Sequence, residues 1–173
     1  MTAVVRASTD ADIEAIADIY AHHVLHGLGS FETEPPNADE MRRRRADIIG
    51  RGLPYLVAED ASGAVLGYAY AGPYRTRAAY LHTVENSVYL RPEAMRRGIG
   101  FALLTALIAA CERCGCRQMV AVVGDSGNAA SIALHLRAGF RLVGTLESVG
   151  FKHGRWVDTV LLQRAIGAGA GPL

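Results

Sequence analysis

Cysteine is scarce in this chain of 173 residues: the only three, Cys111, Cys114 and Cys116, lie within six residues of one another. Small secreted domains that depend on disulfides carry even numbers of cysteines spread along the chain, so we expect reduced thiols and a cytoplasmic location. The spacing C-x-x-C-x-C resembles part of a zinc site. A closed zinc site needs four ligands, however, and no second pair of cysteines or histidines follows at finger spacing. The sequence therefore predicts no metal.

The chain also lacks an excess of charge of either sign, and it lacks a long hydrophobic run. It has 18 Lys and Arg against 17 Asp and Glu, a formal net charge of +1, so nothing predicts a nucleic-acid partner. The longest apolar stretch, 99–111, is interrupted by Gly100 and Thr105 and is too short to cross a bilayer. The N-terminus contains acidic residues and has no apolar signal segment, so no membrane partner is expected.

Apolar residues make up 50% of the sequence and charged residues 20%, which is typical of one globular domain with a sizeable core. No internal repeat is visible. We expect one domain over residues 1–166. Residues 167–173 are rich in Gly, Ala and Pro and poor in large apolar side chains, so they are predicted to form a flexible C-terminal tail.

Hydrophobic periodicity and turn residues predict alternating strands and helices. In the first half, four arginines, Arg42–Arg45, point several ways round a predicted helix and are expected to form a solvated face. Strands and helices alternate strictly only in the middle of the chain, which favours an α/β fold with a mixed sheet. The predicted strands are 4–6, 55–59, 65–71, 81–90, 117–123, 140–148 and 156–162, and the predicted helices are 13–24, 37–50, 98–111 and 129–138.

The segment after the strand 81–90 is the most informative one. Arg96-Arg97-Gly98-Ile99-Gly100 opens an apolar helix. Glycines allow close approach of a ligand, and free N–H groups at a helix N-terminus favour an anion, so this turn suits a pyrophosphate. The Gly-Lys-Ser/Thr of a Walker loop is absent, and Leu103 occupies the third glycine position of the dinucleotide fingerprint. A helix-starting turn without any ligand remains the alternative.

This turn resembles the acetyl-CoA loop of the GNAT acetyltransferase superfamily. A second stretch, from Asn128 to Ser131 with His135 and Gly139-Phe140 after it, resembles the second cofactor-proximal helix of that family. Four further runs are similar to its phosphinothricin N-acetyltransferase subfamily. They are residues 31–35, 70–74, 83–89 and 150–158, so the resemblance covers almost the whole chain.

The resemblance implies a single-domain GNAT acyltransferase fold, in which a central mixed β-sheet is flanked by helices, and it implies a homodimer. Met95 stands where many GNAT loops have Gln or Arg, so Arg96 or Arg97 is expected to replace that phosphate contact. Asn128 either bonds the pantetheine amide or caps its helix. The residues that the resemblance assigns to acetyl-CoA are Val88, Tyr89, Leu90, Arg96, Arg97, Gly98, Ile99, Gly100, Phe101, Ala102, Asn128 and Ser131.

In the resembled mechanism the amine attacks the thioester directly, so a base must first remove a proton from the ammonium ion. We predict Glu85 for this base. Alternate residues of a strand share one face, which here carries Thr83, Glu85, Ser87 and Tyr89. A carboxylate in an apolar run is costly unless it is used or paired, and an ion pair with an arginine of the preceding loop is the alternative.

Two further groups complete the expected chemistry. The resemblance implies that a backbone N–H near Val88–Leu90, at a bulge in the strand, meets the oxyanion. His135 is assigned to thiol or substrate contact, with a satisfied core histidine as the alternative. The other histidines of interest, His22, His23 and His26, are expected at the surface or at a helix end.

The acceptor is expected to be a small molecule with an acid group. Arg75 and Arg77 precede the Glu85 strand, and a guanidinium suits a carboxylate or phosphinate bidentately, although two exposed loop arginines are also ordinary. Tyr80 and Phe31 are predicted to wall the pocket. The resembled subfamily acts on phosphinothricin or on compounds of the methionine sulfone and sulfoximine type. A polyamine or protein N-terminus as acceptor, and a non-catalytic acyl-CoA-binding module, remain alternatives.

Overall fold

Seven strands form one mixed sheet in the order β1-β2-β3-β4-β5-β7-β6 in the computed structural model, which describes residues 3–172. The strands are β1 (Val4–Ala7), β2 (Tyr55–Glu59), β3 (Val65–Pro73), β4 (Thr83–Leu90), β5 (Gln118–Gly124), β6 (Arg141–Lys152) and β7 (Arg155–Ala165). The helices are α1 (Ile13–His26), α2 (Ala38–Gly50), α3 (Ile99–Arg113) and α4 (Ala129–Arg137). The predicted mixed α/β sheet is confirmed.

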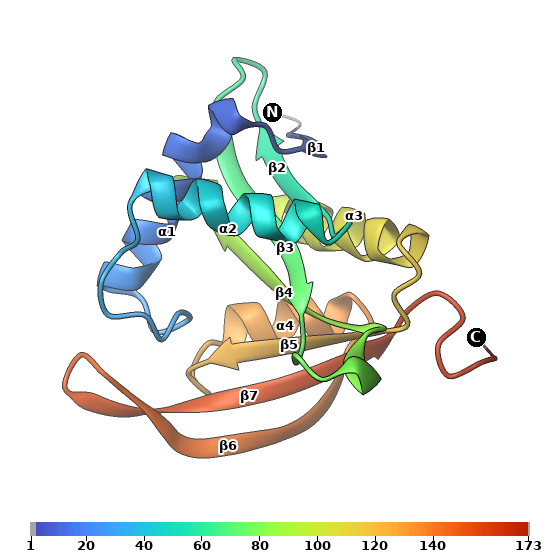
Figure 1. Cartoon of the computed structure of the whole chain (residues 1–173). Coiled ribbons are helices and arrows are strands. Elements are labelled where there is room, and N and C mark those ends of the chain that lie inside the picture. The colour runs from blue at the N-terminus through green and yellow to red at the C-terminus, as the bar shows by residue number, and fades with distance from the viewer. Residues whose placement is uncertain (1–2, 173) are drawn as a thin grey trace.

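The helices cover the sheet in two layers (Figure 1). Helices α1 and α2 pack against β2, β3 and β4, whereas α3 packs against β1 to β4 and α4 against β5 and β6. Helix α3 buries Leu103, Leu104 and Leu107 completely, because residues spaced three and four apart share one helix face. A second apolar cluster joins Ile13 and Ile16 of α1 to the other side of the sheet.

Strand β4 has a different neighbour on each side. It pairs with β3 antiparallel from Val84 to Leu90 without a register shift. Its parallel pairing with β5 ends at Asn86, opposite Ala121. The two strands then diverge, as Figure 1 shows. The bulge predicted near Val88–Leu90 is therefore absent from β4: the break in pairing comes from the departure of β5, and not from an extra residue.

The last hairpin is longer than the sequence predicts. Strand β6 continues to Lys152, four residues beyond its predicted end, and β7 runs on to Ala165. The register of β6 against β7 shifts between Leu142 and Gly144 and again between Leu146 and Gly150. Bulges bend and twist a strand, and Figure 1 shows this hairpin curving beyond the rest of the sheet.

The arginine run 42–45 is only partly a solvated face. Its first two members are exposed and pair with acidic residues of the same helix. Arg44 reaches Glu32 of the α1–α2 loop at 2.7 Å, and Arg45 donates to Ser8 Oγ at 2.7 Å. The second half of the run therefore fastens α2 to the segments beside it.

The C-terminal segment after β7 is described up to residue 172. Ile166 is buried, and the Arg117 guanidinium donates to the carbonyl oxygens of Gly169 and Pro172. The domain boundary at residue 166 and the flexibility of the tail stay predictions.

An ion pair at the start of α1 should make stability depend on pH. Arg6 donates to both carboxylate oxygens of buried Asp12 at 2.8 Å, and these bonds lower the pKa of Asp12 to about 2. A lowered pKa stabilises the folded protein above the unfolded pKa, and this stabilisation is lost as pH falls. We expect Asp12→Asn to cost about 2 kcal/mol of unfolding free energy at pH 7.

The measurement is urea unfolding of wild type and Asp12→Asn between pH 7 and pH 2. The difference should shrink as the pH falls from 4 towards 2. Asp18→Asn, at an exposed position of α1, is the matched control and should leave stability unchanged. A gap between wild type and Asp12→Asn that is constant with pH would assign the loss to packing and not to the ion pair.

Candidate active site

The divergence of β4 and β5 opens a cleft of about 630 Å³. Its walls come from the ends of β4 and β5, the start of α3, helix α4 and the segment after α1. Of the residues predicted for cofactor contact, Val88, Tyr89, Leu90, Arg96, Gly98, Gly100, Phe101, Asn128 and Ser131 line this cleft, together with His135. The structure thus brings together segments that are more than 100 residues apart in sequence.

The backbone of β4 offers hydrogen-bonding groups to the cleft. The Arg91 N–H donates to Leu66 O at 2.9 Å, which continues the ladder between β3 and β4. Since strand backbone groups alternate between the two edges, the N–H groups of Val88 and Leu90 point away from β3 and towards the departed β5. These two donors are available to a ligand that lies along β4.

His23 closes one side of this edge. Its Nε2–H donates to the carbonyl oxygen of Leu90 at 2.8 Å, and its ring lies 5.3 Å from that of Tyr89. His22 and His26 are exposed, as expected. His23 lies at the helix end, the second of the two predicted positions, and it is half-buried because the last turn of α1 folds over the end of β4.

The turn before α3 has the geometry of an anion site. Gly98 is the N-cap of α3 with φ of 79°, and Arg96 also has a positive φ of 59°. Glycine adopts this conformation without steric cost. Gly100 is buried in the first turn, where a Cβ would lie 3.4 Å from Leu90 Cδ1. The free N–H groups of this turn and the exposed Arg96 lie at the mouth of the cleft, whereas Arg97, which is also exposed, does not line it.

Helix α4 forms the opposite wall. Asn128 Oδ1 accepts a hydrogen bond from the Ser131 N–H at 3.2 Å, so the helix-capping alternative for Asn128 is realised. Both residues line the cleft as well. The cap therefore holds Asn128 beside the space that a ligand would enter.

His135 is a buried residue of α4 with both ring nitrogens in use. Its Nδ1–H donates to the Ser131 carbonyl oxygen, and its Nε2 lies 2.8 Å from Asn86 Nδ2. The ring meets Phe140 edge to face at 5.1 Å. Burial lowers the pKa of His135, so the ring is neutral near pH 7. His135 is at once a satisfied core histidine and part of the cleft wall.

Glu85 lies half-buried on the face of β4 that is turned towards α1 and α2. Burial raises the pKa of its carboxyl group, and the Arg75 guanidinium draws that pKa partly back down. Among residues 3–172 neither Arg75 nor Arg77 forms an ion pair with Glu85, so the alternative of a purely structural ion pair is not realised. A half-buried carboxyl group with a raised pKa is suited to proton transfer.

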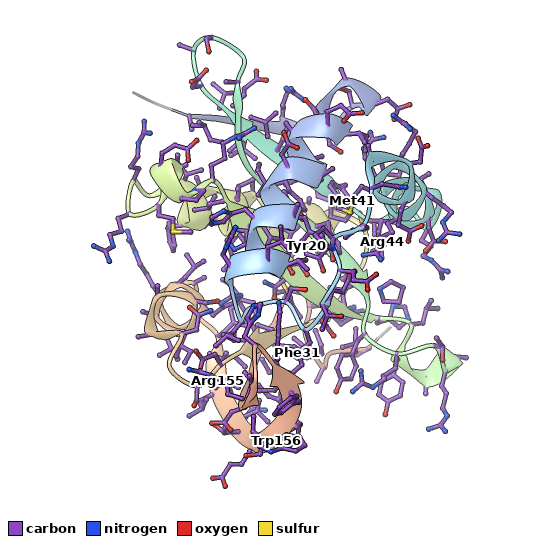
Figure 2. The ribbon with its side chains drawn as sticks, turned by 90° about the vertical axis from the view of Figure 1, so that its left-hand side faces the viewer. Tyr20, Phe31, Met41, Arg44, Arg155 and Trp156 are labelled. Atoms are coloured by element: carbon purple, nitrogen blue, oxygen red, sulfur yellow. The ribbon has the colours of Figure 1, made fainter. Side chains whose placement is uncertain are left out.

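A cluster of tyrosines covers this face of the sheet. The rings of Tyr20 and Tyr89 lie 5.1 Å apart, and the Tyr20 hydroxyl donates to Glu32 Oε1 at 2.7 Å. Arg44 binds the same carboxylate, and Figure 2 shows Tyr20 and Arg44 close together beside the α1–α2 loop. Glu32 is therefore already neutralised by its neighbours, which leaves Glu85 as the less compensated carboxylate on this side.

The residues predicted for the acceptor occupy two loops. In the loop before β4, Arg75 lies over the Tyr74 ring at 4.3 Å, and Tyr80 meets the same ring edge to face at 5.6 Å. Arg77 is exposed and precedes the short 3₁₀ helix Ala78–Tyr80. Of these residues, Arg75 is the one that lowers the pKa of the Glu85 carboxyl group.

Phe31 lies in the α1–α2 loop and points towards the β6–β7 hairpin in Figure 2. A Cβ on Gly150 would lie 2.4 Å from the Phe31 ring, so this contact requires glycine. Buried Lys152 holds the same loop by donating from Nζ to Ser30 O at 2.7 Å. The hairpin thus positions the loop that carries Phe31.

Several residues of the site escaped the sequence-based predictions. They include His23, Asn86 and Lys152, whose partners lie 67, 49 and 122 residues away in the sequence. Arg137 lies over the Phe101 ring at 4.2 Å and also lines the cleft. Its place in the last turn of α4, in the same helix as the predicted contact Ser131, was the one available signal.

The described residues contain no group of three or more His, Cys, Asp or Glu side chains placed to hold a metal ion. No helix within residues 3–172 is long and apolar enough to span a bilayer. The cysteines Cys111, Cys114 and Cys116 are free thiols.

Comparison with known proteins agrees with this architecture. Residues 17–140 match the acetyltransferase (GNAT) family, so the chain belongs to that family and is an acetyltransferase. It is 56% identical over 165 residues to phosphinothricin N-acetyltransferase of Alcaligenes faecalis, covering 95% of this chain and 83% of that one. It is 40% identical to the L-methionine sulfoximine/L-methionine sulfone acetyltransferase of Pseudomonas paraeruginosa, covering 94% of each chain.

The fold is likewise that of a solved relative. The crystal structure of a phosphinothricin acetyltransferase from Sinorhizobium meliloti in complex with acetyl-CoA superposes with a TM-score of 0.97 at 47% identity. The match covers 100% of this chain and 93% of that one. The predicted single-domain GNAT fold is therefore confirmed.

The anion site at α3 leads to a prediction about Gly100. We expect Gly100→Asp to weaken acetyl-CoA binding at least tenfold, because a carboxylate in the first turn would oppose the phosphates and crowd Leu90. Isothermal calorimetry with acetyl-CoA measures this loss. Gly144→Asp is the matched control, since a Cβ there meets nothing within 4 Å. Unchanged affinity in a folded Gly100→Asp protein would place the phosphates elsewhere.

Proposed function

We propose that this protein transfers the acetyl group of acetyl-CoA directly to the amine of a small amino acid or of a toxic analogue of one, of the phosphinothricin or methionine sulfone and sulfoximine type. One observation carries the proposal. A cleft that ends in a turn with the geometry of an anion site lies on one face of β4, and a half-buried carboxyl group, that of Glu85, which does not line the cleft, lies on the other face. The activities named for the relatives support the same substrate class.

Acetyl-CoA occupies the cleft between β4 and β5. Its diphosphate binds the N–H groups at the start of α3, with Arg96 and Arg97 neutralising charge. Its pantetheine arm follows β4, where it replaces the missing strand. The N–H groups of Val88 and Leu90 are the donors closest to the thioester carbonyl, and one of them stabilises the oxyanion of the tetrahedral intermediate.

Glu85 is the general base. It takes a proton from the acceptor's ammonium group, directly or through water, so that the nitrogen can attack the thioester carbon. Its raised pKa brings it closer to that of the group it must deprotonate. His135 lies at the end of the cleft that holds the thiol of coenzyme A. Because the amine attacks the thioester directly, no covalent acyl-enzyme forms.

The acceptor lies on the Glu85 side of β4. Arg75, with Arg77 as the second candidate, binds the acid group of the acceptor, while Tyr80 and Phe31 wall the pocket. The neutralisation of Glu32 by Arg44 makes this side a poor match for a polycation, which favours an amino acid over a polyamine. A protein N-terminus and a non-catalytic role remain outcomes of the experiment below.

We also propose that the chain acts as a homodimer in the cytoplasm. The β6–β7 hairpin exposes a row of large apolar side chains that a second copy would cover: Leu142, Val143, Leu146, Val149, Phe151 and Trp156. Phe151 and Trp156 also contact each other at 5.2 Å between ring centroids. The free thiols suit a reducing compartment.

The test is coenzyme A release with acetyl-CoA and a panel of acceptors, followed by a thiol reagent. Phosphinothricin, methionine sulfone and methionine sulfoximine should be acetylated, whereas spermidine and a peptide with a free N-terminus should not. Turnover only with spermidine or only with the peptide would show that the proposed substrate class is wrong. Acetyl-CoA binding without turnover on any acceptor would favour the non-catalytic module.

Replacing the base should lower turnover and spare cofactor binding. We expect Glu85→Gln to reduce kcat about 10² to 10⁴ fold near neutral pH, with little change in acetyl-CoA affinity. In the wild type, kcat/KM should fall as pH decreases through the raised pKa of Glu85, because protonation removes the base. Wild-type turnover in folded Glu85→Gln would remove Glu85 from the mechanism.

The two loop arginines should differ in a measurable way. Arg75→Ala should raise the acceptor KM about ten- to a hundredfold, as expected for loss of a charge-assisted hydrogen bond, and leave the acetyl-CoA KM unchanged. It should also shift the acid limb of kcat/KM to higher pH, because Arg75 lowers the pKa of Glu85. Arg77→Ala is the matched variant and should not move that limb. Efficient use of decarboxylated acceptors by the wild type would exclude an acid clamp.

A further inference from the structure

The cleft contains a buried hydrogen-bond acceptor that the protein leaves without a partner. Asn86 is 6% exposed and lines the cleft, and its Oδ1 has no hydrogen-bond partner within residues 3–172. It stands at the last pair of the β4–β5 ladder, opposite Ala121, where the strands begin to diverge. Buried acceptors nearly always have a partner, so this one points to a donor that arrives with a ligand.

The neighbours of Asn86 decide which end of its amide is the oxygen. The carbonyl of Ser131 can only accept, so the nitrogen of His135 that faces it, Nδ1, carries the hydrogen. In a neutral ring Nε2 is then a lone-pair acceptor, and the Asn86 group 2.8 Å away must be the N–H donor. Oδ1 is therefore the free end. His135 is left with no hydrogen for any other group.

The face of β4 decides which reactant meets Asn86. Its side chain projects on the same side of β4 as Val84, Val88 and Leu90, which pack in the cluster that contains α3. The anion-binding turn opens α3, so the coenzyme arm enters from this side. Glu85 projects to the opposite face. The sulfur at the end of the arm is therefore the reacting atom nearest to Asn86.

We propose that Asn86 Oδ1 accepts a hydrogen bond from the S–H group of coenzyme A, and that His135 is a positioning residue that acts through Asn86. This inference rests on the proposed function. The acceptor ammonium gives one proton to Glu85, the C–N bond forms, and the C–S bond breaks with its electron pair going to sulfur. A second proton then passes from the acceptor nitrogen to the sulfur, and the resulting S–H group donates a hydrogen bond to Asn86 Oδ1. The thioester of acetyl-CoA has no such hydrogen.

The first experiment is a binding cycle that needs no turnover. Isothermal calorimetry measures coenzyme A and desulfo-coenzyme A, which lacks the S–H group, on wild type and on Asn86→Leu. The ratio of the affinity for coenzyme A to the affinity for desulfo-coenzyme A should be about two- to fivefold higher in the wild type than in Asn86→Leu. This is the size expected for one weak S–H hydrogen bond. An equal loss of affinity for both ligands in Asn86→Leu would overturn the proposal, because a structural or water-holding role has that effect.

Two further variants keep this cycle interpretable. Asn86→Ala is the second variant in case the leucine does not fit, and it should lose the same preference. Gln118→Leu makes the same amide-to-leucine change at the closed end of the same strand pair, opposite Thr83. It should leave both affinities and their ratio unchanged. A changed ratio in Gln118→Leu would assign the effect to the ladder as a whole and overturn the proposal.

The second experiment separates positioning by His135 from acid catalysis. In His135→Gln the side-chain carbonyl can still accept from the Asn86 amide, so this variant should keep the coenzyme preference and most of kcat, with the pH profile of kcat unchanged. His135→Leu removes that acceptor and should lose the preference. Equal losses of kcat in both variants, with disappearance of one limb of the pH profile, would make His135 the proton donor and overturn the proposal.

The outcomes distinguish this inference from the proposed function. Failure of the wild type to bind either coenzyme would reject both. If the wild type binds and turns over, but the effects of Asn86→Leu and of the missing S–H group on coenzyme affinity are simply additive, only the role of Asn86 would be rejected.

Discussion

The site depends on one feature of the sheet: β4 is paired along its whole length on one edge and only as far as Asn86 on the other. A strand with an unpaired edge needs partners for its N–H and C=O groups. One of these groups, the Leu90 carbonyl, is bonded by His23. The N–H groups of Val88 and Leu90 remain open to a ligand. An extended chain with amide groups, such as a pantetheine arm, is the natural replacement for the missing strand.

Strand β4 also divides the chemistry between its two faces. Successive side chains point to opposite sides, so the neighbours Glu85 and Asn86 belong to different environments. Glu85 faces the tyrosine cluster and the Arg75 loop, where burial raises its pKa. Asn86 faces α3 and α4, where His135 orients its amide. A base and a thiol-side group one residue apart can thus act on opposite sides of the same reacting carbon.

The acceptor side is assembled from parts that depend on one another. Lys152 and Gly150 of β6 hold the α1–α2 loop through Ser30 and Phe31. The same loop carries Glu32, which Arg44 and Tyr20 hold against α2 and α1. A change in the hairpin should therefore reach the acceptor pocket without touching the coenzyme cleft.

The sequence alone determined those features of this protein that depend on residues close together in the chain. The glycines at 98 and 100 predicted a turn that a ligand can approach closely, strand alternation placed Glu85 on one face with Ser87 and Tyr89, and the order of strands and helices predicted the mixed sheet. Only the tertiary structure decided where β5 leaves β4, that His23 covers Leu90, and that Asn86 meets His135. The two side-chain contacts join residues 67 and 49 positions apart. Their partners are selected by packing of whole elements, and no local propensity encodes that choice.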